Sequence, residues 1–172
     1  MIAAEAAARS ARPPKRPVPS ERLDPRARTM WQVVGLIVAG SLLLLAVLVG
    51  AALILLDVGV LWACLPAVVT LVLAAAGEIL VPDLLWRTWR YEIGADEVDL
   101  QHGMITVTRT LIPMARIQHV DTRRGPLERR FGLASVVLYT AAGASEIPAL
   151  ADEVAASVRD RIAALANTRD DL

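Results

Sequence analysis

The spacing of hydrophobic residues divides the chain, and two long apolar runs come first. The run WQVVGLIVAGSLLLLAVLVGAALILL carries no charge and would be apolar on every face of a helix. A second uncharged run, VGVLWACLPAVVTLVLAAAG, follows a short turn at Asp57. About 20 predominantly apolar residues are enough to cross the hydrocarbon core of a bilayer. The pattern predicts a two-helix transmembrane hairpin over residues 29–86, with spans at about 30–56 and 58–80.

After the hairpin, from residue 84 to residue 147, the hydrophobic period changes to two. Short alternating runs (RYEI, EVDL, ITVTRTLI, SVVLYT and SEIP) are separated by the turn signals IGADE, QHGM, RRGPL and TAAGAS. Within ITVTRTLI, the residues Ile105, Val107 and Leu111 fall on one face, and threonines fall on the other. This alternation is typical of antiparallel strands with one solvated face. The close spacing predicts a small barrel or sandwich.

The last segment returns to a helical period. One stripe is formed by Leu150, Val154, Val158, Ile162 and Leu165. Acidic residues stand in its first turn and arginines stand later, which matches the helix dipole. The pattern predicts a C-terminal helix that packs on the strands. Strands and helix together form a small α+β domain over residues 87–168, followed by a tail at 169–172.

Residues 1–28 have another texture, because they are rich in Ala, Arg and Pro and lack apolar periodicity. We interpret them as a disordered, basic N-terminal arm. Whether such an arm binds anything or is a solvated tail stays open at this level.

The distribution of positive charge predicts the orientation of the hairpin. The chain has no net charge, but seven Lys or Arg residues precede residue 30, none lies between Met30 and Trp86, and eleven follow. Basic residues concentrate on the cytoplasmic side of membrane proteins. The sequence therefore predicts a multi-pass membrane protein with both termini in the cytoplasm.

Composition and aromatic positions agree with membrane spans. Apolar residues make up 55% of the chain, and the mean hydropathy is +0.49. A cleaved signal peptide would have a shorter apolar region, and the rest of the chain is too small to bury two such helices. Tryptophans concentrate at membrane interfaces. Four are predicted as interfacial anchors: Trp31, Trp62, Trp86 and Trp89.

Two acidic residues, Glu78 and Asp83, fall near the inner end of the second span. An acid inside a membrane marks an ion path in some proteins, and Pro66 in the same span would then be a second functional element. The simpler interpretation is that both acids reach the headgroup water. A small transport or channel accessory subunit is therefore kept as an alternative function.

The chain shows no recognisable catalytic set. It has one cysteine, Cys64, and only two histidines, His102 and His119, which excludes an intrachain disulfide and a Cys- or His-rich metal site. It lacks G-x-S-x-G, P-loop, H-E-x-x-H and dinucleotide-binding motifs. His119 stands near Asp121, but a lone histidine at a strand edge is more often a surface residue. We expect no enzyme activity, no catalytic residues, no cofactor and no metal.

The stretch RRGPLERRFGL carries the candidate contact residues. They are Arg123, Arg124, Arg129 and Arg130. In a structural interpretation, Gly-Pro makes a turn, Leu127 and Phe131 face the core, Gly132 adopts a left-handed conformation, and an arginine pairs with Glu128 or Asp121. In an electrostatic interpretation, the arginines contact anionic headgroups, a phosphorylated ligand or a partner. A nucleic-acid partner is not expected, because no recognised motif and no aromatic interleaving accompany the arginines.

Five motifs in a fixed order resemble a known family. They are YEI at 91–93, VDLQHG at 98–103, IPMARIQHV at 112–120, GPLERRFGL at 125–133 and YTAAG at 139–143. This order resembles the bacterial pleckstrin-homology-like (PH) domains of the membrane-flanked, YdbS-like type. TAAG is one residue longer than the TAG of the family pattern. The resemblance implies a PH-like sandwich with a C-terminal capping helix on the cytoplasmic face, and it implies no known ligand.

Taken together, the sequence predicts a non-enzymatic inner-membrane protein that presents a cytoplasmic PH-like module for protein interaction or assembly. The expected partners are membrane lipids and a membrane protein or a second copy of the chain. Small residues in the first span would support self-association: Gly35, Ala39, Gly50 and Ala51. The alternatives are a module that senses anionic headgroups, and the channel accessory subunit.

Overall fold

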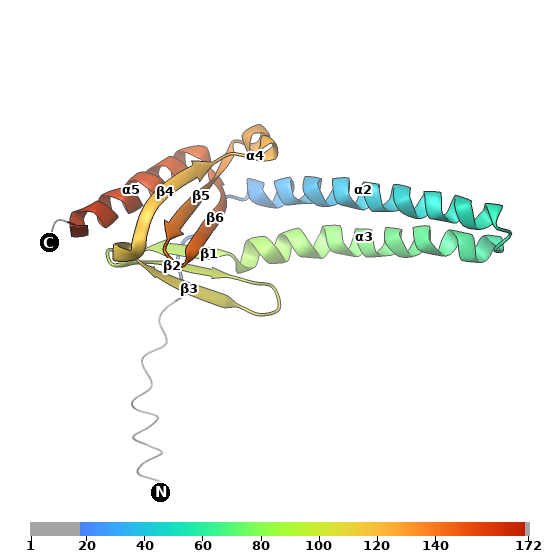
Figure 1. Ribbon diagram of the computed structural model, residues 1–172, viewed down its shortest axis with the longest axis horizontal. Helices are drawn as coiled ribbons and strands as arrows, with labels where there is room; N and C mark the ends of the chain where they lie inside the picture. The colour runs from blue at the N-terminus through green and yellow to red at the C-terminus, as the bar shows by residue number, and fades with distance from the viewer. Residues whose placement is uncertain (1–17, 171–172) are drawn as a thin grey trace, which may run out of the picture.

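The computed structural model describes residues 18–170 and has two parts, a long helical stem and a compact domain at one end of it (Figure 1). The stem consists of helix α2, Arg26–Leu55, and helix α3, Val60–Thr88, which run antiparallel side by side. Both are long and apolar enough to cross a membrane. The predicted hairpin is therefore present, but its helices reach further toward the domain than the predicted spans of 30–56 and 58–80.

The domain contains two antiparallel sheets of three strands each. The first sheet has the order β1-β2-β3 and the second has the order β4-β5-β6. The strands are β1 (Arg90–Ile93), β2 (Glu97–His102), β3 (Thr108–Pro113), β4 (Ile117–Arg123), β5 (Leu133–Thr140) and β6 (Gly143–Ala151). A 3-10 turn η1 (Met114–Arg116) joins the sheets, a short helix α4 (Pro126–Phe131) precedes β5, and helix α5 (Asp152–Asp170) ends the fold.

The core lies between the two sheets and under α5. Val98, Ile112, Leu138 and Ile147 from the strands and Ile162 from α5 belong to one buried cluster. The register pairs Val98 with Ile112 in the first sheet and Val136 with Ile147 in the second, so the inward positions of neighbouring strands coincide. This is the sandwich with a capping helix that the resemblance implied.

Two details of the predicted periodicity are wrong. Ile105 and Val107 do not belong to a strand, because β3 begins at Thr108, and both side chains are exposed. Leu111 is exposed as well, and Ile112 takes the inward place on β3. On α5, Val154 is exposed and Ala155 is buried instead, because the helix begins only after β6 has placed Leu150 in the core.

The predicted N-terminal arm is only partly testable, since residues 1–17 lie outside the described part of the chain. Residues 18–28 contradict the prediction, because they belong to the folded unit. Leu23 is buried in the main core, and Glu21 forms a β-bridge with Tyr91 of β1. One apolar side chain and one bridge fix this segment without any periodic pattern. At the other end, α5 includes part of the predicted tail, and residues 171–172 are not described.

Candidate functional site

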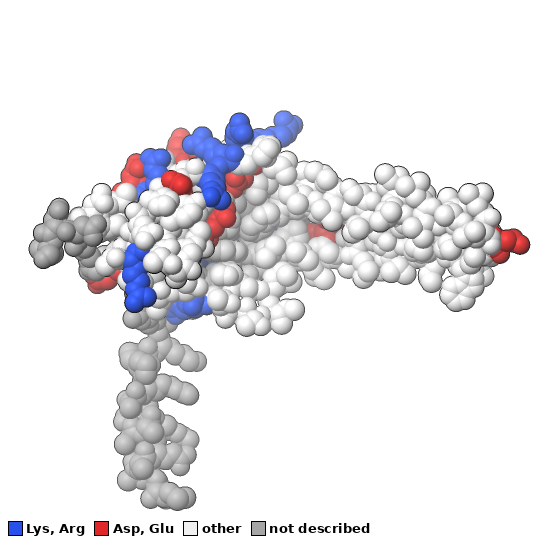
Figure 2. Space-filling view, viewed as in Figure 1, with Lys and Arg blue, Asp and Glu red and all other residues white. Residues whose placement is uncertain are grey.

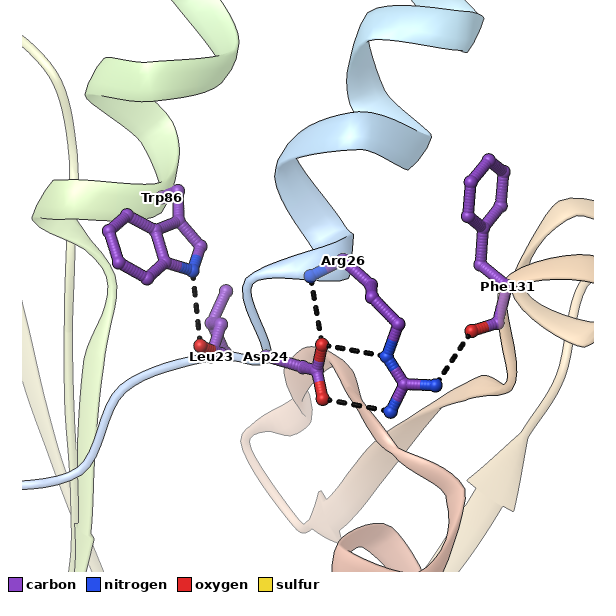
Figure 3. A network of polar contacts seen from close by, with 5 residues as sticks. All are labelled: Leu23, Asp24, Arg26, Trp86 and Phe131. Carbon is purple, nitrogen blue, oxygen red and sulfur yellow. Dashed lines mark hydrogen bonds and ion pairs between the residues drawn. The ribbon is translucent and has the colours of Figure 1, made fainter.

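The stem enters the domain through a joint that is closed by polar contacts (Figure 3). The indole Nε1 of Trp86 on α3 donates to the carbonyl oxygen of Leu23, 3.1 Å away. Arg26, the first residue of α2, donates from Nη1 to the carbonyl oxygen of Phe131 at the end of α4, 3.2 Å away. Asp24 accepts the backbone N–H of Arg26 at 2.8 Å and two of its guanidinium N–H groups at 3.0 Å. The joint therefore links both stem helices to the domain.

The electrostatics of the joint follow from this geometry. Hydrogen bonding to the Arg26 side chain lowers the pKa of Asp24, because it stabilises the charged carboxylate. The guanidinium remains about half exposed, so solvent screens the pair. Apolar packing accompanies the polar contacts. Ala27 and Met30 on the first turns of α2 are buried against Leu133 and Ala149 of the domain.

Three charged residues surround the base of the stem. Asp83 on α3 contacts Arg28 on α2, at 3.1 Å, and Arg87 one turn along its own helix, at 2.7 Å. Asp83 therefore lies among basic residues at the end of α3 that joins the domain, and its contact with headgroup water stays a prediction. From Val60 to Asp83 the helix has about the length needed to cross the roughly 30 Å hydrocarbon core at 1.5 Å per residue. This ion-pair cluster ends the apolar part of the stem on the side of the domain.

Glu78 precedes Asp83 on α3 by about 7.5 Å along the helix axis. It therefore lies further from the domain, and it faces α2. A Cβ atom built on Gly35 would come within 2.1 Å of a Glu78 carboxylate oxygen, so the glycine makes room for the acid. Both residues line a lateral groove of about 720 Å³ between the helices, together with Pro66 and Thr70. The groove places Pro66 and Glu78, the two elements of the channel hypothesis, on one surface, and that hypothesis stays a prediction.

The short helix α4 organises the arginine-rich stretch. Gly125 precedes the helix, Pro126 occupies its first turn, and Gly132 ends it with a left-handed φ of 65°. Leu127 and Phe131 pack against the smaller core cluster. The inward pair and the left-handed glycine of the structural interpretation are thus confirmed, whereas the predicted Gly-Pro turn is the start of a helix, because the fixed φ of Pro126 suits the first helical position.

Neither of the two predicted partners, Glu128 and Asp121, forms an ion pair with an arginine within residues 18–170. Glu128 accepts a hydrogen bond from the backbone N–H of Gly125 at 2.6 Å and another from Ser135 Oγ at 2.6 Å. Ser135 in turn accepts the backbone N–H of Ala149. Since both carboxylate oxygens of Glu128 are occupied, this residue fastens α4 to β5 and β6 and does not neutralise an arginine.

The four arginines divide into two pairs with different surroundings. Arg123 donates to the hydroxyl of Tyr139 and lies over its ring, and Arg124 forms an ion pair with Asp152. Arg129 and Arg130 are exposed on α4 and form no ion pair within residues 18–170. Figure 2 shows basic side chains over α4, at the end of the domain that adjoins the stem. These two arginines are exposed positive charges without an ion pair among the described residues.

The tryptophans occupy the two ends of the stem. Trp31 and Trp86 are partly buried against the domain core, and Trp89 packs there too and stacks on His102 with ring centroids 4.8 Å apart. Trp62 is exposed near the far end of α3. Three of the four predicted anchors therefore also hold the joint, and their role at the membrane interface stays a prediction.

The histidines act as packing residues. His102 ends β2 and stacks on Trp89, and His119 stacks on Tyr139 at 4.2 Å. The Nε2 atom of His119 is 4.0 Å from the Asp121 carboxylate, and both side chains are more than half exposed.

Sequence reasoning missed Asp24 and Arg26. A signal was available, because LDPR combines an acid and a proline directly before an apolar run, which is typical of a helix start. It also missed the pair of Asp99 on β2 and Arg109 on β3, whose Nε lies 3.0 Å from both carboxylate oxygens. Nothing in the sequence indicated that pair, since the two residues are not directly opposite each other in the strand register.

Two apolar helices that run without a linker into a two-sheet domain with a C-terminal helix define a membrane-anchored protein with a PH-like domain. The chain belongs to the family described as Bacterial PH domain, which it matches over residues 27–166. The resemblance seen in the ordered motifs is therefore confirmed.

Two relatives from Bacillus subtilis (strain 168) are similar to this chain. It is 46% identical over 92 residues to the UPF0699 transmembrane protein YdbS, a match that covers 54% of this chain and 58% of YdbS. It is 29% identical over 77 residues to the UPF0699 transmembrane protein YdbT, a match that covers 45% of this chain and 16% of YdbT. The matches thus cover less than two thirds of either relative. No solved structure matches the chain.

Proposed function

We propose that this chain is a non-enzymatic protein of the bacterial inner membrane that presents its PH-like domain in one fixed orientation for protein interaction or assembly. The distribution of Lys and Arg supports a cytoplasmic domain and cytoplasmic termini, because basic residues flank the stem on the domain side alone. A membrane anchor confines the domain to the membrane plane and raises its effective concentration for a membrane partner.

The observation that carries the proposal is the closed joint. Helix α3 ends at Thr88 and β1 begins at Arg90, while Trp86 and Arg26 tie both helices to backbone carbonyls of the domain. A flexible tether would let the domain turn freely. This joint holds every copy with the same face toward the membrane, which is the arrangement that a repeated assembly or a membrane partner needs.

The well-connected polar groups support a non-enzymatic role. The carboxylates of Asp99 and Glu128 each hold two segments of the fold together, and Asp24 fixes the Arg26 side chain that reaches Phe131. Groups used in this way maintain the structure, and their pairing would have to be broken before they could act on a substrate.

The test is to purify the tagged full chain from its native membranes and measure the stoichiometry of what accompanies it. We expect a stoichiometric membrane protein or a defined homo-oligomer. Trp86→Phe removes the indole hydrogen bond to Leu23 and part of the packing of the joint, and should reduce the yield of the complex, whereas Val72→Ala on the lipid-facing stem should not. A monomer that carries lipid alone would contradict the proposal.

A second function, contact with anionic headgroups, is favoured by Arg129 and Arg130. They are exposed and unpaired within the described residues, and α4 contacts α2 at the base of the stem. Basic groups near an anionic leaflet gain about 1 kcal/mol each. The two stem helices already anchor the chain, so these contacts would orient the domain and would not be needed to attach it.

Hydrogen exchange of the full chain in nanodiscs tests this second function. Amides of α4 should exchange more slowly with phosphatidylglycerol present than in phosphatidylcholine alone. Arg129→Gln with Arg130→Gln should abolish the difference. The control is Arg116→Gln, an exposed arginine on η1, which follows β3 and is far from α4 in the chain. Equal exchange in both lipids for the unmodified chain would contradict headgroup contact.

A further inference from the structure

The hairpin between β2 and β3 carries an unusual number of exposed apolar side chains. Outside the stem, six large apolar residues of the described chain are exposed. Four of them lie on this hairpin: Met104, Ile105, Val107 and Leu111. Ile105 is 98% exposed, which is the most extreme value of any large apolar side chain in residues 18–170. Water is a costly surrounding for such a side chain, so a cluster of them indicates a contact surface.

The turn that presents these residues has a specified conformation. Gly103 has a φ of +124°, and a Cβ atom there would come within 2.0 Å of the Thr106 carbonyl oxygen. Only glycine fits this position without strain. His102, directly before it, stacks on Trp89, which directly follows α3. The tip is therefore held in a fixed position relative to the stem.

The hairpin lies beside the end of the stem that joins the domain. β1 starts immediately after α3 and runs away from the stem, so the antiparallel β2 runs back toward it. Figure 1 shows the loop after β2 extending along the direction of α3, beside its last turns. Those turns contain Asp83 and Arg87 of the ion-pair cluster that ends the apolar part of the stem.

The tip of the β2–β3 hairpin carries no charged residue, and the charged residues on the strands next to it form a pair. Residues 100–108 include no Asp, Glu, Lys or Arg. The nearest charged side chains on the two strands, Asp99 and Arg109, bind each other. A lipid interface accepts an apolar turn that brings no unpaired charge with it.

We propose that the β2–β3 turn, residues 103–107, inserts its apolar side chains into the interfacial region of the bilayer that holds the stem. A lipid surface is the occupant that the geometry favours over a protein, because the exposed tip lies beside the last turns of α3, a helix long and apolar enough to cross a membrane. Leu84 on the adjoining part of α3 is exposed in the same way. The proposal rests on the transmembrane stem and is independent of the proposed assembly role.

This insertion complements the basic helix. The tip adjoins α3, whereas α4 adjoins α2, and in Figure 1 the base of the stem lies between them. Apolar insertion on one side and arginines on the other would fix the tilt of the domain against the membrane.

The test uses a single fluorescent label on the full chain in phosphatidylcholine nanodiscs, which contain no anionic lipid and leave both faces open to solvent. Cys64→Ser removes the native thiol, and Ile105→Cys places bimane on the tip. The matched control is Ala95→Cys, an exposed residue in the turn at the opposite end of β2. Both positions are exposed, so neither substitution removes a core contact.

We expect bimane at residue 105 to show a blue-shifted emission, loss of quenching by aqueous iodide and strong quenching by nitroxide on lipid chains. Bimane at residue 95 should be open to iodide and insensitive to the lipid nitroxide. Val107→Cys should behave like Ile105→Cys and guards against a local effect of one site. Iodide quenching equal to that of residue 95 would overturn the proposal. Protection from iodide without quenching by the lipid nitroxide would also overturn it, because a protein would then cover the tip.

Discussion

The stem and the domain treat apolar side chains in opposite ways. Along the stem the largest ones point outward, as with Leu55 and Leu61, which are 87% and 88% exposed. In the domain the comparable residues Leu138 and Ile147 are fully buried. The space-filling view reflects this, since the stem is almost entirely white and the domain carries the charge (Figure 2). Each part is stable only in its own solvent, lipid for the stem and water for the domain.

The boundary between stem and domain is the most informative region, because apolar side chains that face outward and apolar side chains that face a core lie there within a few residues of each other. There Met30 is buried against the domain and Trp86 is partly buried, while Leu84 remains exposed to the surroundings of the stem. The joint, the exposed arginines of α4 and the apolar turn after β2 all belong to this boundary. The features that suggest function therefore gather where the solvent changes.

The largest expected effect separates the two kinds of burial. Leu138→Ala in β5 should lower the free energy of unfolding of the domain by about 3 kcal/mol, because it leaves a cavity in a closed core. The same truncation at Leu48, which is 59% exposed on α2, should cost well under about 1 kcal/mol. Denaturant titration of the purified chain in detergent measures both. Equal losses would contradict the contrast between stem and domain.

The next effect tests the solvent of the stem. Val72→Arg puts a charge on an outward-facing position midway between Val60 and Asp83, and should cost about 3 kcal/mol of insertion free energy. Leu61→Arg, at the far end of α3, should cost much less, since an arginine there reaches the headgroups. A membrane-insertion assay compares the two. If position 72 tolerates arginine as well as position 61 does, α3 does not cross a bilayer.

The hydrogen bonds that hold α4 to the domain should contribute somewhat less to the free energy of unfolding than the two effects above. Glu128→Ala leaves the buried Ser135 hydroxyl without its acceptor and frees the N–H of Gly125, so the domain should lose about 2 kcal/mol. Glu146→Ala, on an exposed part of β6, should be nearly neutral. Thermal unfolding followed by circular dichroism distinguishes these outcomes. A neutral Glu128→Ala would mean that α4 is held by Leu127 and Phe131 alone.

The smallest effect concerns acid and the joint. The pKa of Asp24 is lowered in the folded chain from an ordinary value of 3.8, so its contribution is present above about pH 4 and is lost as the pH falls below that value. Asp24→Asn should lower the free energy of unfolding by about 1 kcal/mol at pH 7. The variant should then lose less of its free energy of unfolding than the unmodified chain when the pH is lowered.

Unfolding measured between pH 7 and pH 2 tests the role of Asp24. Asp160→Asn serves as the control, since Asp160 is 68% exposed and pairs only with the adjacent Arg159. If the two variants follow the same pH profile, Asp24 makes no special contribution to the joint.

Periodic features of this fold were predictable from the sequence, and single contacts were not. A run of apolar residues identifies a span because every position has to meet lipid, and alternation identifies a strand because side chains alternate between its faces. Leu23 has no such neighbours, so its burial between the sheets left no pattern to read. The prediction for residues 103–107 was wrong for the opposite reason. Their apolar and polar residues alternate as in a strand, although Gly103 bends the chain out of the sheet.

The candidate site was predictable to a similar degree. The sequence grouped four arginines, and the structure separates them by their partners, which sequence spacing does not reveal. Arg124 meets Asp152, a residue that follows two further strands later in the chain. Glu128 was adjacent to the arginines and was expected to pair with them, but Ser135 and the N–H of Gly125 bind it because α4 turns it toward β5.

The most direct test of the closed joint is a distance distribution between stem and domain. The native Cys64 on α3 and a second cysteine from Ala95→Cys in the β1–β2 turn accept spin labels, and the full chain in nanodiscs is measured by double electron–electron resonance. A single narrow distribution is the predicted result, because both helices are tied to the domain. A broad distribution would contradict a fixed orientation and would show a domain that turns on its anchor.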